Sequence, residues 1–310
     1  MKKTGFGKAS GKIILIGEHA VVYNQPAIAL PFTKTSIQTQ ISPANVRLLE
    51  SKYFTGMLED APKELENLKQ VTTKFLKLAD HENAGFSIKI DSQIPDERGM
   101  GSSAAAAISL IRALADYFDF PLSQEELSQL ADFSEKIAHG NPSGIDVATV
   151  SNTQPVWFIK DEKIEYFPLR LSNTYLLVAD TGQKGQTRQI VEEVAQLIKE
   201  NPQAMEDIEE LGRLSQEAKT ALMNDEKEAL GNIFNQAQNH LKALGVSNSR
   251  IDFFVQMALE HGALGAKLTG SGRGGCIIAL ADSKENALKI AQTFHQEGIQ
   301  DLWIQDLNAG

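Results

Sequence analysis

Two glycines and two serines stand directly before a run of strong helix formers in the segment Gly99-Met-Gly-Ser-Ser-Ala-Ala-Ala-Ala107. Pro95 ends any preceding element, and Ser102 or Ser103 can cap a helix that we predict over 104–118. The start of such a helix presents unpaired backbone N–H groups and the positive end of the helix dipole. These features make an anion site, for which phosphate is the usual occupant. Many helices begin this way for capping alone, so the assignment depends on the rest of the chain.

Polar residues also flank a buried-looking strand that we predict at 12–16. Lys12 opens this strand, and Glu18 and His19 follow it, where the end of a strand would face a cleft. Near the other end of the chain, Lys267–Cys276 is too rich in glycine to pack side chains. Such a loop suits close approach of its backbone to a ligand.

Two carboxylates, Glu135 and Asp146, are joined by a tight turn. We predict a helix over 124–138 that opens with the capping box Ser123-Gln-Glu-Glu126, so Glu135 falls in its last turn. The turn Gly140-Asn-Pro-Ser-Gly144 then delivers Asp146. Ordinary roles stay open for both residues, because Glu135 can lie on a solvated helix face and Asp146 can cap a turn.

Together, the four segments indicate phosphoryl transfer. That reaction needs backbone amides around phosphates, a Mg²⁺ that bridges them, a carboxylate beside the acceptor hydroxyl and a cation near the developing charge. Taken singly, Lys12 can be an ordinary strand-end lysine, and His19 can be a structural histidine. These ordinary roles do not explain why both residues occur together with the two carboxylates and the glycine loops. The sequence has no Gly-x-x-x-x-Gly-Lys-Ser/Thr loop and no His-Arg-Asp or Asp-Phe-Gly set, which excludes P-loop NTPases and protein kinases.

The composition is that of a globular chain: 310 residues, 42% hydrophobic and 23% charged, with room for one large domain or two smaller ones. A net charge of −10 without a basic run argues against nucleic acid as a partner. No apolar run is long enough to span a membrane, and the one at 13–16 is too short for a signal peptide, so we expect a cytoplasmic protein without a membrane partner. The lone Cys276 excludes an intrachain disulfide, and the histidines lack metal-ligand spacing.

The pattern of predicted elements changes near residue 170. Before it, we predict strands at 12–16, 27–30, 36–41 and 86–90 and helices at 104–118 and 124–138. After it, we predict strands at 175–179, 266–268, 276–281 and 302–304 and helices at 187–199, 207–223, 226–244, 249–260 and 283–297. Without the extra helices the second half reads β-α-β-β-α-β, the ferredoxin-like arrangement. We therefore predict two domains, 1–170 and 171–310, with the site in the cleft between them.

The order and spacing of the four segments resemble those of the GHMP small-molecule kinases, and among them the mevalonate kinase family. Gly11–Tyr23 resembles the first motif, Gly99–Ala105 the phosphate loop and Lys267–Cys276 the third motif. The segment His139-Gly-Asn-Pro-Ser-Gly-Ile-Asp146 is similar to the one that carries the catalytic base. The resemblance spans the whole chain and implies an α+β fold. Its N-terminal domain would be ribosomal-protein-S5-like with a left-handed crossover, and its C-terminal domain ferredoxin-like.

The resemblance also implies a role for each matching residue. Asp146 would be the base, or the group that orients the acceptor hydroxyl, and Lys12 would favour ionisation of that hydroxyl. Ser103 and Glu135 would hold Mg²⁺. The ATP phosphates would be cradled by the loop residues Glu97, Arg98, Gly99, Met100, Gly101, Ser102 and Ser103. The acceptor would be lined by Glu18, His19, Gly270, Ser271 and Gly272. A homodimer is left open.

The phosphate loop departs from the family at Asp96-Glu97-Arg98, where many relatives have glycine or alanine. Two acids beside a triphosphate are unfavourable, so we expect their side chains to point to solvent. For Arg98, a phosphate contact and a solvated position at the rim both stay open.

The activity implied is ATP- and Mg²⁺-dependent phosphorylation of the primary hydroxyl of mevalonate, a step of isoprenoid precursor synthesis. Kinases of phosphomevalonate, homoserine or galactose are alternatives, although Glu18-His-Ala-Val-Val differs from the Glu-His-Thr-Asp typical of galactokinases. A diphosphomevalonate decarboxylase is disfavoured by the first motif and by the His-Gly-Asn-Pro-Ser-Gly segment at 139–144. An alternative outside the enzymes is an inactive relative that binds nucleotide or metabolite as a sensor. The presence of Lys12, Ser103, Glu135 and Asp146 argues against this alternative.

Overall fold

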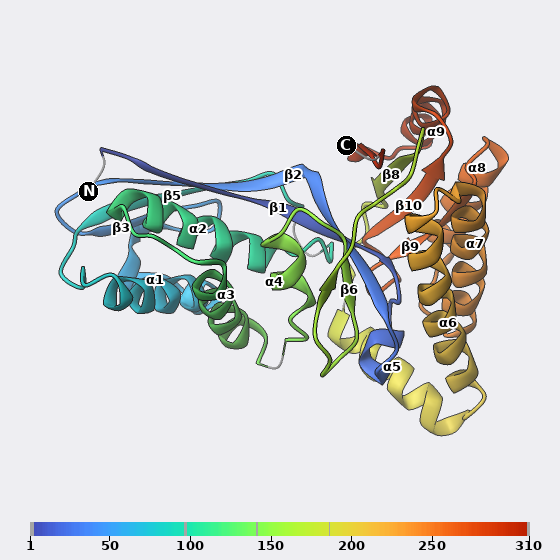
Figure 1. The fold of residues 1–310 in the computed structure, drawn as a ribbon, viewed down its shortest axis with the longest axis horizontal. Helices are drawn as coiled ribbons and strands as arrows, with labels where there is room; N and C mark the ends of the chain where they lie inside the picture. The colour runs from blue at the N-terminus through green and yellow to red at the C-terminus, as the bar shows by residue number, and fades with distance from the viewer. Residues whose placement is uncertain (1–2, 96–97, 141, 186, 309–310) are drawn as a thin grey trace. The chain divides into compact units, whose positions relative to one another are not determined.

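The computed structural model describes residues 3–95, 98–140, 142–185 and 187–308 (Figure 1). Its contacts divide the chain into two compact units. Unit 1 comprises Met1–Lys12, Pro31–Asp96 and Gly101–Thr153, and unit 2 comprises Ile13–Leu30, Glu97–Met100 and Gln154–Gly310. The units interleave along the chain because the strands β1 (Gly5–Ile16) and β2 (Ala27–Pro43) each contribute residues to both. The predicted boundary near residue 170 stays a prediction.

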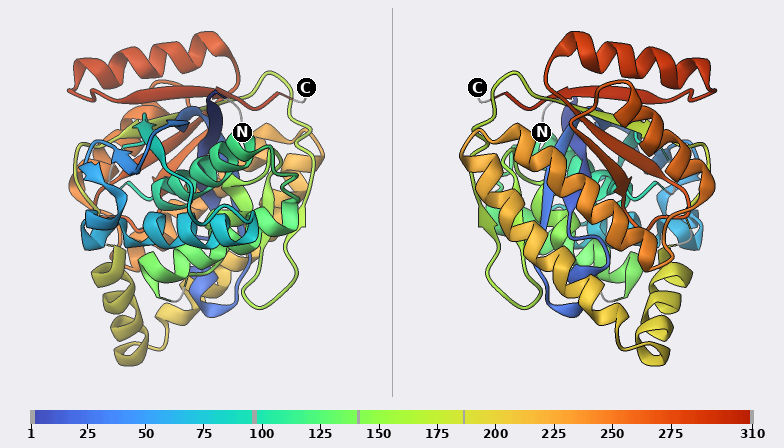
Figure 2. Two further views of the ribbon diagram at one scale, coloured as in Figure 1. Left: turned by 90° about the vertical axis from the view of Figure 1, so that its left-hand side faces the viewer. Right: turned by 90° about the vertical axis from the view of Figure 1, so that its right-hand side faces the viewer.

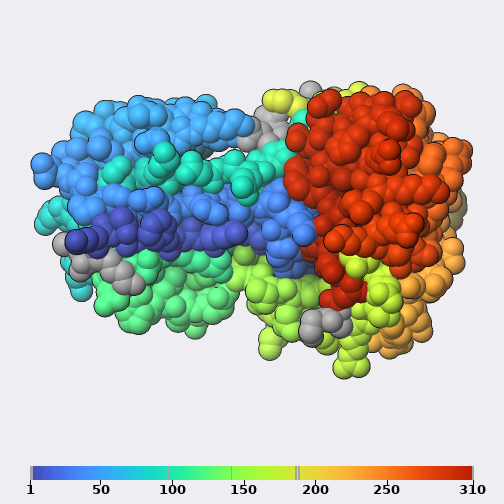
Figure 3. All heavy atoms as spheres, turned by 90° about the horizontal axis from the view of Figure 1, so that it is seen from above, coloured from blue at the N-terminus to red at the C-terminus, as the bar shows by residue number. Residues whose placement is uncertain are grey.

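Unit 1 is built on a sheet in the order β4 (Thr55–Met57), β3 (Arg47–Glu50), β5 (Phe86–Ser92) and β2, with β1 paired to β2. Strands β3 and β5 are parallel, with Leu49 opposite Ile88. The predicted alternation along β5 is confirmed, since Phe86, Ile88 and Ile90 are buried and the residues between them are more exposed. Figure 3 looks onto β1, β2 and β5, which lie side by side there without a covering helix.

The helices of unit 1 cover the apolar face of this sheet (Figure 1). They are α1 (Glu66–Leu78), α2 (Ser102–Phe118), α3 (Gln124–His139) and the short α4 (Ile145–Val150). The capping box predicted at the start of α3 is confirmed: Ser123 accepts from the backbone of Glu126, whose side chain accepts from the backbone of Ser123. The serine cap predicted for α2 is wrong, because Gly101 is the N-cap and both serines lie inside the helix.

Unit 2 contains a four-stranded antiparallel sheet in the order β11 (Leu302–Asp306), β8 (Tyr175–Asp180), β10 (Cys276–Ala281) and β9 (Gly265–Thr269). This order, with α9 (Lys284–Gln296) lying along β11 in Figure 2, is that of the predicted ferredoxin-like arrangement. The first crossover holds four helices: α5 (Thr187–Glu200), α6 (Ala204–Met223), α7 (Lys227–Ala243) and α8 (Ser249–Glu260). A shorter ladder joins the start of β2 to β6 (Val156–Phe158) and β6 to β7 (Glu165–Tyr166).

Helix α7 covers the outer edge of β9 with two amide side chains. Asn235 Oδ1 accepts the backbone N–H of Ala266 at 3.1 Å, and Gln238 Oε1 accepts that of Leu268 at 2.9 Å. These residues are three apart on the helix and two apart on the strand, so one helix face matches one strand edge. The pairing satisfies donors that an edge strand leaves open and fixes the position of Lys267 between them.

Several elements differ from the sequence predictions. The strands predicted at 27–30 and 36–41 are one strand, β2, which continues through Pro31, while β1 begins seven residues before the predicted start at Lys12. No element was predicted for β3, β4, β6, β7, α1 or α4. Among the described residues, no helix combines the length and apolarity needed to cross a bilayer.

Candidate active site

The phosphate-loop candidate leads into α2 through two glycines with positive φ, Gly99 at 70° and Gly101 at 71°. A Cβ on Gly101 would lie 2.9 Å from Cγ of Lys12, so glycine is needed for the close approach of the two segments. Because α2 begins at Ser102, its first backbone N–H groups and its positive dipole end follow the loop directly. Glu97 and Asp96 lie outside the described residues.

Lys12 and Asp146 form an ion pair in unit 1, with Nζ 2.9 Å from Oδ1. The Lys12 side chain is only 8% exposed, whereas that of Asp146 is 35% exposed, so the carboxylate remains open to a ligand. Gly144, at φ 87°, is the N-cap of α4 and places Asp146 in the first helical turn. Lys12 is therefore not an ordinary strand-end lysine, because it lies inside β1, and Asp146 is not the N-cap of α4.

Glu135 is buried near the end of α3 rather than on a solvated helix face. Its Oε1 atom has no hydrogen-bond partner among the described residues, and its Oε2 lies 3.7 Å from His139 Nε2. Burial raises the pKa of Glu135, the hydrogen bond from Ser103 and the charge of His139 lower it, and the nearby Asp146 raises it again. The charge of Lys12 also lowers this pKa, but burial is the largest effect and opposes ionisation of the carboxyl.

Glu135 and Ser103 fit a bound Mg²⁺. A buried carboxylate oxygen without a partner and an adjacent hydroxyl are the hard oxygen ligands that this ion prefers. Mg²⁺ is usually held by one or two carboxylates together with substrate phosphates. The described residues contain no cluster of three or more His, Cys, Asp or Glu with metal-site geometry.

In unit 2, His19 is the central residue of a strained turn. Its backbone has φ 61° and ψ −42°, and the N–H of Ala20 donates to the carbonyl of Glu18 at 2.7 Å. This is the geometry of a classic γ-turn, which is rare and strained, at roughly 1–3 kcal/mol for such outliers. The His19 ring is buried, its Nε2 lies 2.9 Å from the carbonyl oxygen of Ser271, and burial lowers its pKa.

Glu18 is buried next to this turn and forms an ion pair with Lys267, the first residue of the glycine-rich segment. The two side chains are 1% and 0% exposed. Burial lowers the pKa of Lys267, and the Glu18 charge opposes that shift. No role was predicted for Lys267 from the sequence, although its place as the first residue of the third motif was an available signal.

The glycine-rich loop after β9 packs its backbone closely against neighbouring segments of unit 2. Gly270 and Gly272 have φ values of 84° and 83°, and a Cβ on Gly272 would lie 2.1 Å from the carbonyl oxygen of Val246. Between them, the hydroxyl of Ser271 accepts from that of Thr187 at 3.1 Å. The loop therefore has no room for a side chain at Gly272, whereas at Gly270 only the positive φ favours glycine.

Arg98 is neither solvated at a rim nor without a protein partner. Its Nε donates to Oδ2 of Asp180 at 2.6 Å, and the two side chains are 12% and 6% exposed. The second oxygen of Asp180 accepts the backbone N–H of Gly182 at 2.8 Å. Asp180 was missed by sequence reasoning, and its place at the end of a predicted strand before Thr-Gly was the available signal.

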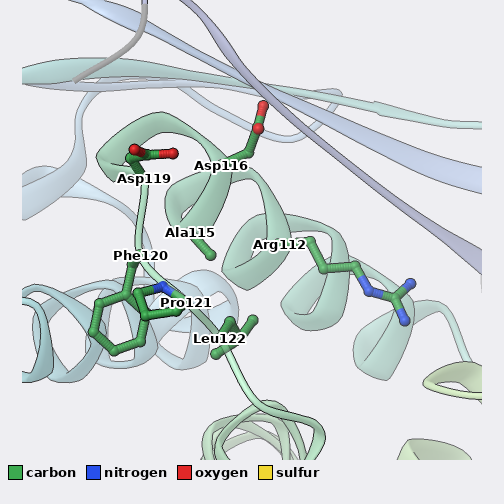
Figure 4. Close-up of a pocket in the computed structure, with 7 residues that line it drawn as sticks. All are labelled: Arg112, Ala115, Asp116, Asp119, Phe120, Pro121 and Leu122. Atoms are coloured by element: carbon green, nitrogen blue, oxygen red, sulfur yellow. The ribbon is translucent and has the colours of Figure 1, made fainter.

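A pocket of unit 1 lies apart from the charged residues described above. It is lined along the end of α2 and the following turn by Arg112, Ala115, Asp116, Asp119, Phe120, Pro121 and Leu122 (Figure 4). The guanidinium of Arg112 is engaged by the carbonyls of Lys8 and Ser151. None of the candidate catalytic, nucleotide or metal residues lines this pocket, so it is not the candidate site.

Comparisons with known proteins identify the family. Residues 66–153 match the family model of the GHMP kinases N-terminal domain, and residues 191–300 that of the GHMP kinases C-terminal domain. A mevalonate kinase of Thermococcus gammatolerans is 35% identical over 308 residues, which cover 92% of this chain and 91% of that protein.

Solved structures agree in fold over nearly the whole chain. The crystal structure of mevalonate kinase from methicillin-resistant Staphylococcus aureus MRSA252 matches with a TM-score of 0.80 at 35% identity, covering 99% of this chain and 100% of that one. The Methanococcus jannaschii mevalonate kinase matches with a TM-score of 0.84 at 25% identity, covering 96% of each chain. The chain therefore belongs to the GHMP kinases, which are ATP-dependent small-molecule kinases, and among them to the mevalonate kinases.

Proposed function

We propose that this chain transfers the γ-phosphoryl group of ATP to the primary hydroxyl of mevalonate and so gives 5-phosphomevalonate. The observation that carries the proposal is the pairing of Lys12 with the half-exposed Asp146 at 2.9 Å, in a chain that belongs to the mevalonate kinases. A carboxylate open to a ligand and a cation fixed against it are what attack by an alcohol requires.

Asp146 would accept the proton of the acceptor hydroxyl as its oxygen attacks phosphorus. For this, the hydroxyl oxygen must come within about 2.6–3.2 Å of the carboxylate. Lys12 would turn its ammonium from the carboxylate toward the same oxygen, because a nearby cation favours the negative charge that develops there. The close packing of Gly101 on Lys12 limits how far this side chain can move.

Glu135 and Ser103 would hold Mg²⁺, which neutralises charge on the phosphates when it is bound. The backbone amides from Arg98 to Ser103 would cradle the phosphates at the start of α2. We propose that Arg98, held by Asp180, shapes this loop through its backbone. The role of Glu97 stays a prediction.

The acceptor would be lined by Glu18, His19, Gly270, Ser271 and Gly272. Of these, His19 and the glycine-rich loop are tied to one another through the carbonyl of Ser271. A cytoplasmic location and a homodimer also stay predictions.

A coupled assay for ADP release over a small panel of alcohols tests the proposed function. We expect turnover with mevalonate and little or none with phosphomevalonate, homoserine or galactose. Turnover of another alcohol in place of mevalonate would keep the kinase but overturn the substrate. Absence of any turnover, with nucleotide still bound, would favour the sensor alternative.

ATP with Mg²⁺ is expected to stabilise the fold in a metal-dependent way. At a ligand concentration one hundredfold above the dissociation constant, binding adds about 2.7 kcal/mol to the free energy of unfolding. Thermal denaturation with ATP and Mg²⁺, and then with ATP and EDTA, measures the stabilisation by ATP and its dependence on the metal. A shift that EDTA does not reduce would contradict the proposed metal site.

A further inference from the structure

Lys267 is a buried lysine to which the proposed mechanism gives no step. Its side chain is 0% exposed, and its Nζ donates to the Glu18 carboxylate and, at 2.7 Å, to the carbonyl of Leu268. Replacing a buried ion pair by apolar side chains of similar volume is often neutral or stabilising. Cohesion alone is therefore a weak explanation for two charges at this place.

Strand β9 holds the segment before His19 at two points. Thr269 donates its hydroxyl to the carbonyl of Ile14 at 2.7 Å, and Lys267 binds the carboxylate of Glu18. These two residues are two apart, so they lie on the same face of the strand. The strand itself is fixed on one side by β10 and on the other by Asn235 and Gln238 of α7. Lys267 is thus a fixed anchor for Glu18.

Glu18 in turn forms the first corner of the strained turn at His19, since its carbonyl accepts the N–H of Ala20. A histidine at φ 61° and ψ −42° relaxes toward an ordinary conformation unless its neighbours prevent it. The Lys267 ion pair restrains the residue before it, and the Ser271 carbonyl restrains its ring. One contact therefore acts on the residue before the strained position, and the other acts on its side chain.

The contact with Ser271 also distinguishes the two ring nitrogens, because it engages Nε2 and not Nδ1. Burial lowers the pKa of His19, the hydrogen bond to Ser271 opposes this shift, and the charge of Arg273 adds to it, so the pKa lies below its ordinary value. The carbonyl partner requires the proton on Nε2. The ring is then neutral at pH 7, and its Nδ1 is an acceptor. Such a ring reads a hydroxyl group, which donates, and not a carboxylate.

We infer that Lys267 is a positioning residue for the acceptor alcohol: by anchoring Glu18 it maintains the strained turn that presents Nδ1 of His19 to a hydroxyl of the acceptor. The inference rests on the proposed function, in which His19 lines the acceptor. Lys267 acts through Glu18 and is not itself a catalytic residue.

Steady-state kinetics of Lys267→Met test this role. We expect the KM for mevalonate to rise about tenfold or more, while the KM for ATP stays near that of the wild type. In a His19→Ala background the same substitution should have no further effect, because residues that act through one another are not additive. Lys219→Met is the matched control, since this lysine pairs with the exposed Glu165 elsewhere in unit 2. Equal increases in both KM values, or additive effects, would overturn the inference.

A second variant controls for a loss of stability in Lys267→Met. Lys267→Met leaves the Glu18 carboxylate buried without its cation, which is strongly destabilising in general. Glu18→Gln combined with Lys267→Met removes both charges, so we expect a melting temperature near that of the wild type and a KM for mevalonate that is still raised. A folded double variant with the wild-type KM would show that the anchor is not needed.

NMR of the apo protein separates this inference from the proposed function. We expect the ¹⁵N shifts of the His19 ring, assigned with His19→Gln, to show a protonated Nε2 and an unprotonated Nδ1 in the wild type. In the double variant they should move toward an exchanging mixture of tautomers, whether or not mevalonate is the substrate. Unchanged ring shifts would overturn the positioning role, whereas an inactive wild type with the expected shifts would overturn only the proposed function.

Discussion

Asp146→Asn is expected to lower kcat by about 10²–10³-fold while ATP and mevalonate still bind. The amide keeps the shape of the side chain but cannot take the proton of the attacking hydroxyl. Rapid-quench measurement of the phosphoryl-transfer step, together with ligand binding by calorimetry, separates the two effects. A variant that phosphorylates mevalonate near the wild-type rate would remove Asp146 as the base.

Lys12→Met should show a rate defect of similar size, because the two side chains meet at 2.9 Å and would act on one oxygen. If they act as a unit, the double variant should be little worse than either single variant. Asp119→Asn is the matched control: this aspartate ends α2 at φ 56°, a conformation that asparagine also tolerates, and it lines the pocket apart from the site. Losses that multiply in the double variant would show that the two residues act on different steps.

After residue 174, the fold of unit 2 was largely predictable, because the strands and helices there carry strong patterns and differ from the predictions only by a few residues at their ends. Unit 1 was less so. Helix α1 was missed although Leu68, Val71 and Phe75 recur at helical spacing, since its threonines and short flanking turns obscured the pattern. The short strands β3 and β4 are defined by their pairing partners rather than by their own residues.

The site was predictable where its residues are joined by local motifs. Glycine-rich turns and helix ends indicated Gly101, Ser103, Glu135 and Asp146, and the structure brings Lys12 to Asp146 and Ser103 to Glu135. The partners of Glu18 and Arg98 could not be predicted, because Lys267 and Asp180 are 249 and 82 residues away along the chain. Two residues so far apart along the chain share no pattern in a single sequence that would indicate a buried ion pair between them.

Glu135→Gln is expected to separate stability from activity. We expect the half-saturating Mg²⁺ concentration to rise by about one to two orders of magnitude and turnover to fall, because the amide lacks the charge that a hard cation prefers. Without ligands, however, the variant should melt at a higher temperature than the wild type at pH 7. The wild-type carboxyl is buried with an oxygen that has no hydrogen-bond partner among the described residues, and the substitution removes a group whose ionisation burial opposes.

The pH dependence of the stability of the apo protein determines the direction of this expected difference in melting temperature. Burial raises the folded-state pKa of Glu135 above its ordinary value of 4.5, so the folded protein holds this proton to a higher pH than the unfolded chain does. The stabilisation that protonated Glu135 gives the folded protein is fully present below pH 4.5 and is lost as the pH rises through the folded-state pKa. Melting curves of the apo proteins should therefore coincide at low pH and diverge above that window, with Glu135→Gln the more stable. Glu82→Gln, at an exposed glutamate of unit 1, should follow the wild type throughout. If Glu135→Gln melts below the wild type at pH 7 without metal, the Glu135 carboxylate is stabilised by the protein itself and has no need of a cation.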